Sequence, residues 1–185
     1  MITRFLQKSV QDALKSFPAV AVLGARQVGK TTLAKEVARQ QKKAVIYLDL
    51  ENPIDRNKLH DSFTYLNDNK EKLIIIDEIQ RMPNLFAELR SLIDVYRKSG
   101  RFILLGSASP DLVKGVSETL AGRILYTYLH TVSFAEGYEK YSLNKQWMRG
   151  GFPEMLTSKN DLLFAQRTDT FITTFIERDL QNLFG

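Results

Sequence analysis

The chain has 185 residues, of which 44% are hydrophobic and 25% charged, a balance typical of one folded domain with a small appendage. It contains no cysteine and two histidines, which excludes disulfides, thiolate nucleophiles and cysteine-based zinc sites. The formal net charge of +5 permits attraction to a polyanion such as DNA, and the lack of a long apolar run leads us to expect a cytoplasmic protein without a membrane partner.

The first elements in chain order are an amphipathic helix and a buried strand. Apolar residues recur at three- and four-residue spacing over 2–17, which predicts a helix with one buried face that ends at Pro18. The run AVAVL at 19–23 is continuously apolar, as in strands that are buried on both faces of a parallel sheet. A second helical stripe follows, formed by Leu33, Ala34, Val37 and Ala38.

Further strands alternate with helices up to residue 130. The clearest helix is expected at 84–98, and the charged segment 51–71 is expected to form short helices and loops. Buried strands that alternate with helices predict an α/β fold, in which helices flank a parallel sheet. After residue 130 the strand pattern stops, so we expect a core over 1–130 and a helical appendage or lid over 131–185. The remaining strands are expected at 44–50, 72–77, 101–106 and 123–129.

A glycine-rich loop follows the first strand. The sequence GARQVGKTT matches the pattern G-x-x-x-x-G-K-[ST], whose backbone amides surround a phosphate at the start of a helix. Lys30 is expected to reach the β- and γ-phosphates, and the Thr31 hydroxyl to bind Mg²⁺. Arg26 and Gln27 either contact phosphate or form an exposed loop tip. The residues expected to hold the nucleotide are Gly24, Ala25, Arg26, Gln27, Val28, Gly29, Lys30, Thr31 and Thr32.

Two adjacent acids end the most apolar run of the chain, IIIDEIQRMP. A phosphate-loop enzyme needs a carboxylate at the end of another parallel strand to hold Mg²⁺, and Asp77 is the expected residue. Hydrolysis also needs a base that polarises the attacking water, and Glu78 is the expected group. At an isolated strand end such acids could equally cap a helix or face solvent, but the phosphate loop argues against that interpretation.

Three polar residues could complete this site. Ser107 and Ser109 follow a strand, where a hydroxyl could sense the γ-phosphate or only satisfy the turn that Pro110 begins. Arg123 opens the last strand, where its guanidinium could stabilise transition-state charge within the chain or across a subunit boundary, or simply lie on the surface. A homo-oligomer is therefore one expected partner. The candidate catalytic residues are Glu78, Lys30, Arg123 and Ser107.

The motifs together resemble a prokaryotic family of AAA-type P-loop ATPases, in which the ATPase domain precedes a C-terminal domain of unknown function. They span about 17–183 and read GARQVGKTTLAK, IIIDEIQRMPNLFAELRSLID, FILLGSAS, LAGRIL, SFAE, RGGFPE and FIERDL. The resemblance implies ATP as the nucleotide, Mg²⁺ coordination by Thr31 and Asp77, and water activation by Glu78. It implies, less directly, a sensor role for Ser107 and an arginine role for Arg123.

The resemblance carries two further expectations. One other strand should separate the strand of the magnesium acid from the strand of the phosphate loop. Members of the family continue well past the FIERDL stretch, so we expect this chain to be an N-terminal piece or a shortened form.

Three functions remain open on the sequence. The favoured one is an ATPase whose hydrolysis drives a conformational change. A small-molecule kinase would share the phosphate loop, but a kinase must exclude the water that Glu78 would activate. The third is a nucleotide-gated module that hydrolyses little ATP and acts on a protein or on DNA. DNA contact is weakly supported, because no helix clusters arginine and lysine.

Overall fold

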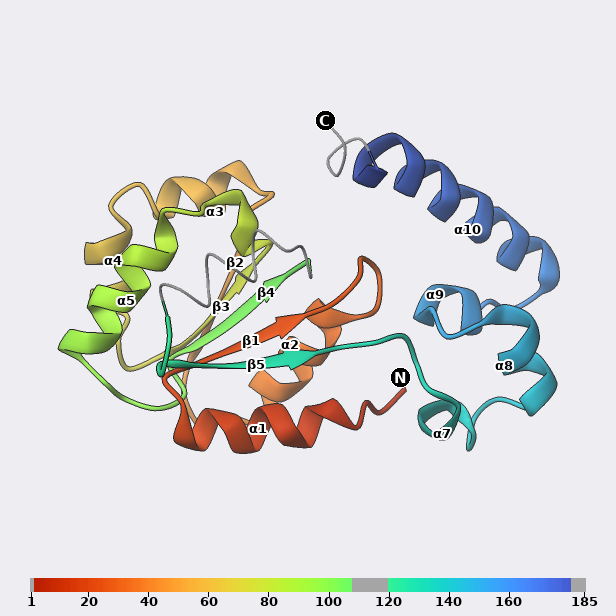
Figure 1. Ribbon diagram of the computed structural model, residues 1–185, viewed down its shortest axis with the longest axis horizontal. Coiled ribbons are helices and arrows are strands. Elements are labelled where there is room, and N and C mark those ends of the chain that lie inside the picture. Colours follow the sequence, from red (N-terminus) through yellow and green to blue (C-terminus); the bar gives the residue numbers. More distant parts are fainter. Residues whose placement is uncertain (1, 108–119, 181–185) are drawn as a thin grey trace. The chain divides into compact units, whose positions relative to one another are not determined.

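The structure is a computed structural model, and it describes residues 2–107 and 120–180 of the chain. The chain divides into two compact units, one formed by Thr3–His130 and the other by the segment that begins at Thr131. The first unit contains a five-stranded sheet, and the described part of the second is helical (Figure 1).

The sheet is parallel throughout, with the strand order β2-β3-β4-β1-β5. Its three inner strands are buried at every position, whereas the two outer strands are partly exposed, which explains why the inner strands are the most continuously apolar. The expected α/β class is thus confirmed, as is the single strand, β4, between β3 and β1. The strands are β1 (Ala19–Leu23), β2 (Val45–Asp49), β3 (Leu73–Asp77), β4 (Phe102–Gly106) and β5 (Ile124–Tyr128).

Because all strand pairs are parallel, every strand ends at the same edge of the sheet. We call this the carboxyl edge and the opposite one, where the strands begin, the amino edge. Leu23 lies opposite Gly106 and Tyr128, and Asp49 lies opposite Asp77, so the loops that follow these strands leave the sheet at one level. In open parallel α/β sheets, ligands bind outside this edge.

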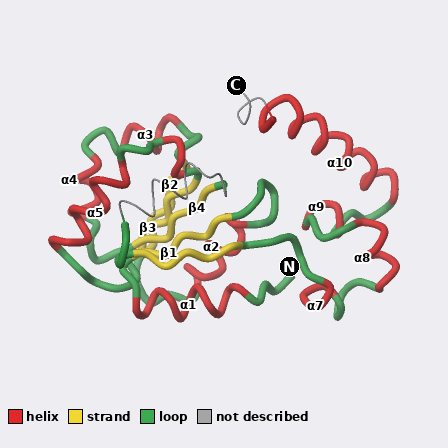
Figure 2. The backbone as a smooth tube through the Cα atoms, in the orientation of Figure 1, coloured by secondary structure: helices red, strands yellow, loops and turns green. Residues whose placement is uncertain are grey.

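Helices cover both faces of the sheet (Figures 1 and 2). The helices α1 and α2 pack together and contact β1, β3, β4 and β5, while α4 packs beside α5. The expected helix at 84–98 ends earlier, at Val95, because Tyr96 adopts a non-helical backbone conformation. The helices among the described residues of this unit are α1 (Leu6–Ser16), α2 (Lys30–Arg39), α3 (Pro53–Lys58), α4 (Ser62–Asp68), the 3-10 helix η1 (Ile79–Arg81) and α5 (Leu85–Val95).

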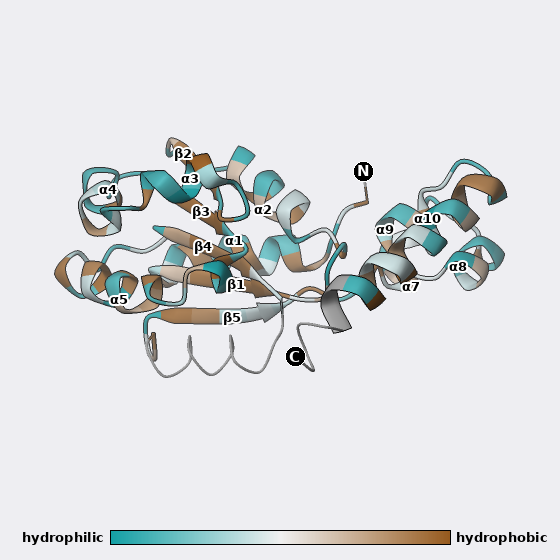
Figure 3. Ribbon diagram, turned by 90° about the horizontal axis from the view of Figure 1, so that it is seen from above, coloured by the Kyte–Doolittle hydropathy of each residue, from teal (hydrophilic) through white to brown (hydrophobic). Residues whose placement is uncertain are grey.

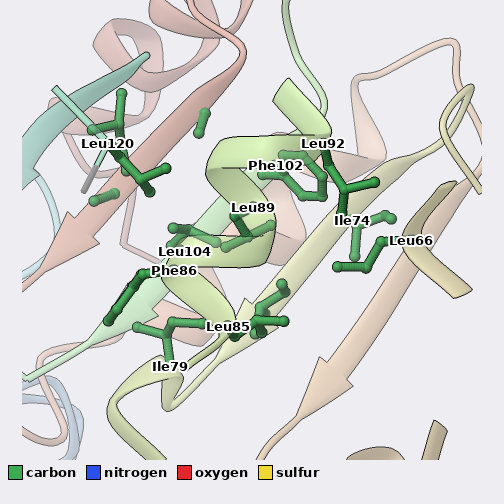
Figure 4. Close-up of a cluster of buried hydrophobic side chains, with 14 of the residues drawn as sticks. Leu66, Ile74, Ile79, Leu85, Phe86, Leu89, Leu92, Phe102, Leu104 and Leu120 are labelled. Carbon is green, nitrogen blue, oxygen red and sulfur yellow. The ribbon is translucent and has the colours of Figure 1, made fainter. Parts of the chain in front are cut away.

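The main core lies between α5 and the sheet (Figure 4). Three- and four-residue spacing puts the apolar residues of α5 on one face, where they meet alternate residues of β3 and β4. Figure 3 shows the same distribution as hydropathy, with hydrophobic residues concentrated on the strands. This packing fixes the end of β3, which carries the two adjacent acids. The buried residues that α5 contributes are Leu85, Phe86, Leu89, Leu92 and Ile93.

The second unit begins with short helices, the first two of which start at a serine that caps the helix. The Ser133 side chain accepts from the Glu136 amide while the Glu136 carboxylate accepts from the Ser133 amide, which is a complete capping box. A Cβ atom at Gly151 would lie 2.5 Å from the Val132 carbonyl oxygen, so this position of the GGFP stretch requires glycine. In the described residues, every helix is too short or too polar to cross a bilayer. The helices are α7 (Phe134–Gly137), α8 (Leu143–Arg149), α9 (Pro153–Leu156), α10 (Asp161–Thr174) and the π-helix η2 (Phe175–Leu180).

Candidate functional site

The glycine-rich loop leaves β1 at the carboxyl edge and enters α2. A Cβ atom at Gly24 would lie 2.3 Å from the Leu129 carbonyl oxygen, so no other residue fits there without a backbone shift. Gly29 is the N-cap of α2 and has a φ of 97°, a left-handed conformation that glycine adopts at little cost. Gln27 also has a positive φ, of 60°. The backbone therefore turns sharply twice before the helix, as a loop that surrounds a small anion must.

Other residues of the loop differ in exposure. Val28 is buried, and its carbonyl oxygen accepts a hydrogen bond of 2.9 Å from Arg4, a residue that the sequence did not single out. Ala25, Gln27 and Thr32 are exposed, while Arg26 is half-buried. This hydrogen bond connects the buried side of the loop, at Val28, to the segment that precedes α1.

Lys30 is the first residue of α2, and its side chain folds back across the loop. Its Nζ atom donates to the carbonyl oxygens of Gly24 at 3.0 Å and Ala25 at 2.9 Å. Burial lowers the pKa of Lys30, although the nearby carboxylates of Glu78 and Asp77 act in the opposite direction. The ammonium group is held where an anion in the loop would meet it.

The Thr31 hydroxyl and the Asp77 carboxylate meet beside this loop. Thr31 Oγ1 donates to Asp77 Oδ2 at 2.6 Å, and the Glu78 amide donates to Asp77 Oδ1 at 3.0 Å. The donor set fits Mg²⁺, which prefers oxygen ligands and usually takes one or two from the protein and the rest from phosphate and water. Among the described residues, no group of three or more acidic, histidine or cysteine side chains could hold a metal alone. Thr31 and Asp77 are accordingly the residues that would hold Mg²⁺ together with a nucleotide.

Tyr47 also contacts this carboxylate, although sequence reasoning missed it. Its phenol donates to Asp77 Oδ2 at 2.7 Å. Burial, followed by this hydrogen bond, raises the pKa of Tyr47 above its usual range, so the phenol remains a donor. The only available signal was its position in β2, two residues before the strand ends at Asp49.

Glu78, like Gln27, is a non-glycine residue with a positive φ. Its φ of 55° and ψ of 45° are left-handed, a conformation that costs a non-glycine residue on the order of 1–3 kcal/mol. Its carboxylate accepts a hydrogen bond from Gln80 Nε2. The Gln80 Oε1 atom is buried and has no hydrogen-bond partner within the described part of the chain. Such strain and such an unsatisfied polar atom are frequent at functional sites.

Arg81, the residue after Gln80, points to a different partner. Its guanidinium forms an ion pair of 2.9 Å with Glu51, which lies just past the end of β2. The pair is largely exposed, so it contributes little to stability. Gln80 rather than Arg81 is therefore the neighbour that restrains Glu78.

The two candidate serines lie beyond the end of β4. Ser107 directly follows Gly106 and is half-buried at the carboxyl edge, between the strands of the loop and of the acids. Ser109 lies outside the described residues. A sensor role for Ser107 stays a prediction.

Among the candidates that the structure describes, Arg123 is the one that lies away from this site. It precedes β5 at the amino edge, where its carbonyl oxygen accepts from the Ala19 amide. Its guanidinium forms a two-point ion pair with Asp94 of α5, at 2.7 and 2.8 Å. A five-residue strand spans roughly 16 Å, so Arg123 cannot reach a phosphate in the loop of its own chain. The interpretation of Arg123 as an arginine finger in cis is wrong, and a role across subunits stays a prediction.

A parallel sheet in this strand order, with a glycine-rich loop after β1 and a carboxylate at the end of β3, is the arrangement of a P-loop protein. Residues 16–138 match the family described as "AAA domain", and the chain belongs to this family of AAA-type P-loop ATPases. Family and fold together support nucleotide binding of the ATPase kind.

Individual proteins are also similar to this chain. Uncharacterized proteins of Mycobacterium tuberculosis and Mycobacterium bovis are each 41% identical over 174 residues, which is 94% of this chain. The chain spans 38% of the length of these curated relatives. A Walker-type ATPase of Pyrococcus abyssi has a similar fold, with a TM-score of 0.65 over 99% of this chain and 75% of that one, at 15% identity.

Proposed function

We propose that this chain binds ATP with Mg²⁺ and hydrolyses it, and that hydrolysis drives a conformational change. The contact of 2.6 Å between Thr31 Oγ1 and Asp77 Oδ2 carries the proposal, because it joins the phosphate loop to the acid strand. A hydroxyl and a carboxylate at this spacing are what a nucleotide-bound Mg²⁺ needs from the protein.

Each residue has a distinct task in the proposed reaction. The loop amides and the Lys30 ammonium bind the phosphate oxygens, and Thr31 and Asp77 orient the metal. Bound Mg²⁺ would neutralise the negative charge that the phosphates carry. Glu78 accepts a proton from the water that attacks the γ-phosphate, and the bond between the γ-phosphorus and the β–γ bridging oxygen breaks.

The moving part in this proposal is the helical unit that begins at Thr131. Closure of a lid over a bound nucleotide would exclude bulk water and couple the reaction to movement. The interpretation of 131–185 as a lid remains a proposal, as do a homo-oligomer and a DNA or protein partner.

Phosphate release from ATP tests the proposal directly. We expect release without any added acceptor in the presence of Mg²⁺, and none in EDTA. If phosphate left ATP only when a nucleoside or a sugar was added, the chain would be a kinase and the proposal would be wrong. If ATP bound tightly without turnover under all conditions, the chain would be a nucleotide-gated module instead.

A further inference from the structure

The Tyr47 side chain reaches from β2 to the acid at the end of β3. Tyr47 lies opposite Ile75 in the register of the two strands, and Asp77 lies two residues further along on the same face. A diagonal neighbour at this spacing is within reach of an aromatic side chain. The phenol therefore leans along the strands toward the carboxyl edge and donates to Asp77 Oδ2 at 2.7 Å.

Asp77 is held at both carboxylate oxygens. Oδ1 accepts from the Glu78 amide at 3.0 Å, and Oδ2 accepts from both Thr31 and Tyr47. Of these donors, the Thr31 hydroxyl is the one that is assigned to the metal, so its orientation must change when a metal binds. Tyr47 has no such second task, and its hydrogen bond can hold Oδ2 in place with and without the metal.

Lys35 lies over the face of the Tyr47 ring. Its Nζ atom lies 4.4 Å from the centroid of the ring, as in a cation–π contact. Lys35 belongs to α2, the helix that begins at the phosphate loop. The Tyr47 side chain thus contacts both the helix that follows the phosphate loop and the carboxylate at the end of β3. A residue that positions Asp77 needs such supporting contacts.

We propose that Tyr47 is a positioning residue, which holds the Asp77 carboxylate in the orientation that a Mg²⁺–nucleotide complex requires. This inference rests on the proposed function, because it presupposes that the nucleotide binds with Mg²⁺. In this role, Tyr47 itself would touch neither the metal nor the phosphates. It acts through Asp77, as the outer hydrogen-bond partners of metal ligands do.

The test is the gain in nucleotide affinity that Mg²⁺ provides. The Kd of a fluorescent, non-hydrolysable ATP analogue is measured in excess Mg²⁺ and in EDTA, for the wild type and for Tyr47→Phe. The Mg²⁺ gain is the Kd in EDTA divided by the Kd in Mg²⁺. We expect this ratio to fall about tenfold in the variant, because the lost hydrogen bond goes to a charged group. The Kd in EDTA should stay within about twofold. An unchanged ratio would overturn the proposal and leave Tyr47 as a packing residue.

Tyr126→Phe is the matched control. Tyr126 lies in β5, and its phenol oxygen is buried without a hydrogen-bond partner in the part of the chain that the structure describes. Removing this oxygen should leave the Mg²⁺ gain at its wild-type value. An equal fall of the ratio in both tyrosine variants would contradict a specific role for Tyr47.

A double-mutant cycle separates failure of this inference from failure of the proposed function. In an Asp77→Asn background, Tyr47→Phe should cause no further loss of the Mg²⁺ gain, because both changes act through one carboxylate. Additive losses would overturn the proposal. A wild-type protein whose affinity does not depend on Mg²⁺ would contradict the proposed function itself.

Discussion

At the residue scale, the two adjacent acids differ in what holds them. Asp77 is buried and accepts hydrogen bonds from Thr31, Tyr47 and the Glu78 amide. Glu78 is half-buried, has a left-handed backbone and accepts from Gln80. A buried, fully bonded carboxylate suits a metal ligand, whereas a restrained and partly accessible one suits a base that must meet water.

Glu78→Gln should separate binding from hydrolysis. The amide keeps the shape of the side chain and an oxygen that can still accept from Gln80 Nε2, but it cannot act as the base. We expect turnover to fall by about 10²–10⁴-fold, with the affinity for ATP within about twofold of the wild type. Phosphate release and equilibrium binding measure the two effects.

Glu51→Gln is a matched control for this change. Glu51 is exposed and pairs with Arg81, outside the proposed catalytic groups. Its variant should keep wild-type turnover. Equal turnover in Glu78→Gln and the wild type would show that another group is the base.

Sequence patterns predicted some of these residues and missed others for a physical reason. The loop and the acids occur at fixed spacings next to apolar strands, so they can be recognised from the sequence alone. Tyr47 and Gln80 act through the direction of their side chains, which depends on strand register and on the turn after β3. The prediction that Arg123 acts within its own chain was wrong. Arg123 directly precedes a parallel strand, and the starts of parallel strands lie at the amino edge, away from the carboxyl edge.

At the element scale, the inner strands and α5 form the layer that supports the site. These elements were predictable from the sequence. A strand buried on both faces is continuously apolar, and a half-buried helix has apolar residues at three- and four-residue spacing. The edge strand β2 has only one fully buried residue, Leu48. Packing therefore restricts the sequence of β2 less than that of the inner strands. The core between α5 and the sheet includes Ile74 and Ile76 of β3, so it supports the strand that ends at Asp77.

Leu89→Ala tests this support. Leu89 is fully buried in α5 and belongs to the main core. Removing its branched side chain leaves a cavity, and we expect the free energy of unfolding to fall by about 2–5 kcal/mol. Urea unfolding of both proteins measures the difference.

Arg90→Ala, the next position on the same helix, is the control for the helix itself. Arg90 is exposed, and its substitution should change stability by no more than about 0.5 kcal/mol. If both variants lost the same amount of stability, helix propensity rather than core packing would explain the loss.

At the scale of the whole molecule, the two edges of the sheet have different tasks. The carboxyl edge carries the loop, the acids and Ser107, which lie at or just after the ends of strands. At the amino edge, Arg123 is paired with Asp94, and Arg97 donates to the Gly122 carbonyl oxygen. Within one chain, the groups at the amino edge are too far from the loop to act on a nucleotide. They can contribute to hydrolysis only if a second chain brings them to the carboxyl edge of the first.

Arg123→Ala measures whether this happens. In dilute solution, where chains are separate, we expect the variant to match the wild type in turnover per chain and in ATP affinity, because its guanidinium does not reach the loop of its own chain. Phosphate release is measured over a wide range of protein concentrations for both proteins. Turnover per chain that rises with concentration in the wild type alone would identify Arg123 as a group that acts across a subunit boundary. Turnover lost from the variant at every dilution would contradict the placement of Arg123 at the amino edge.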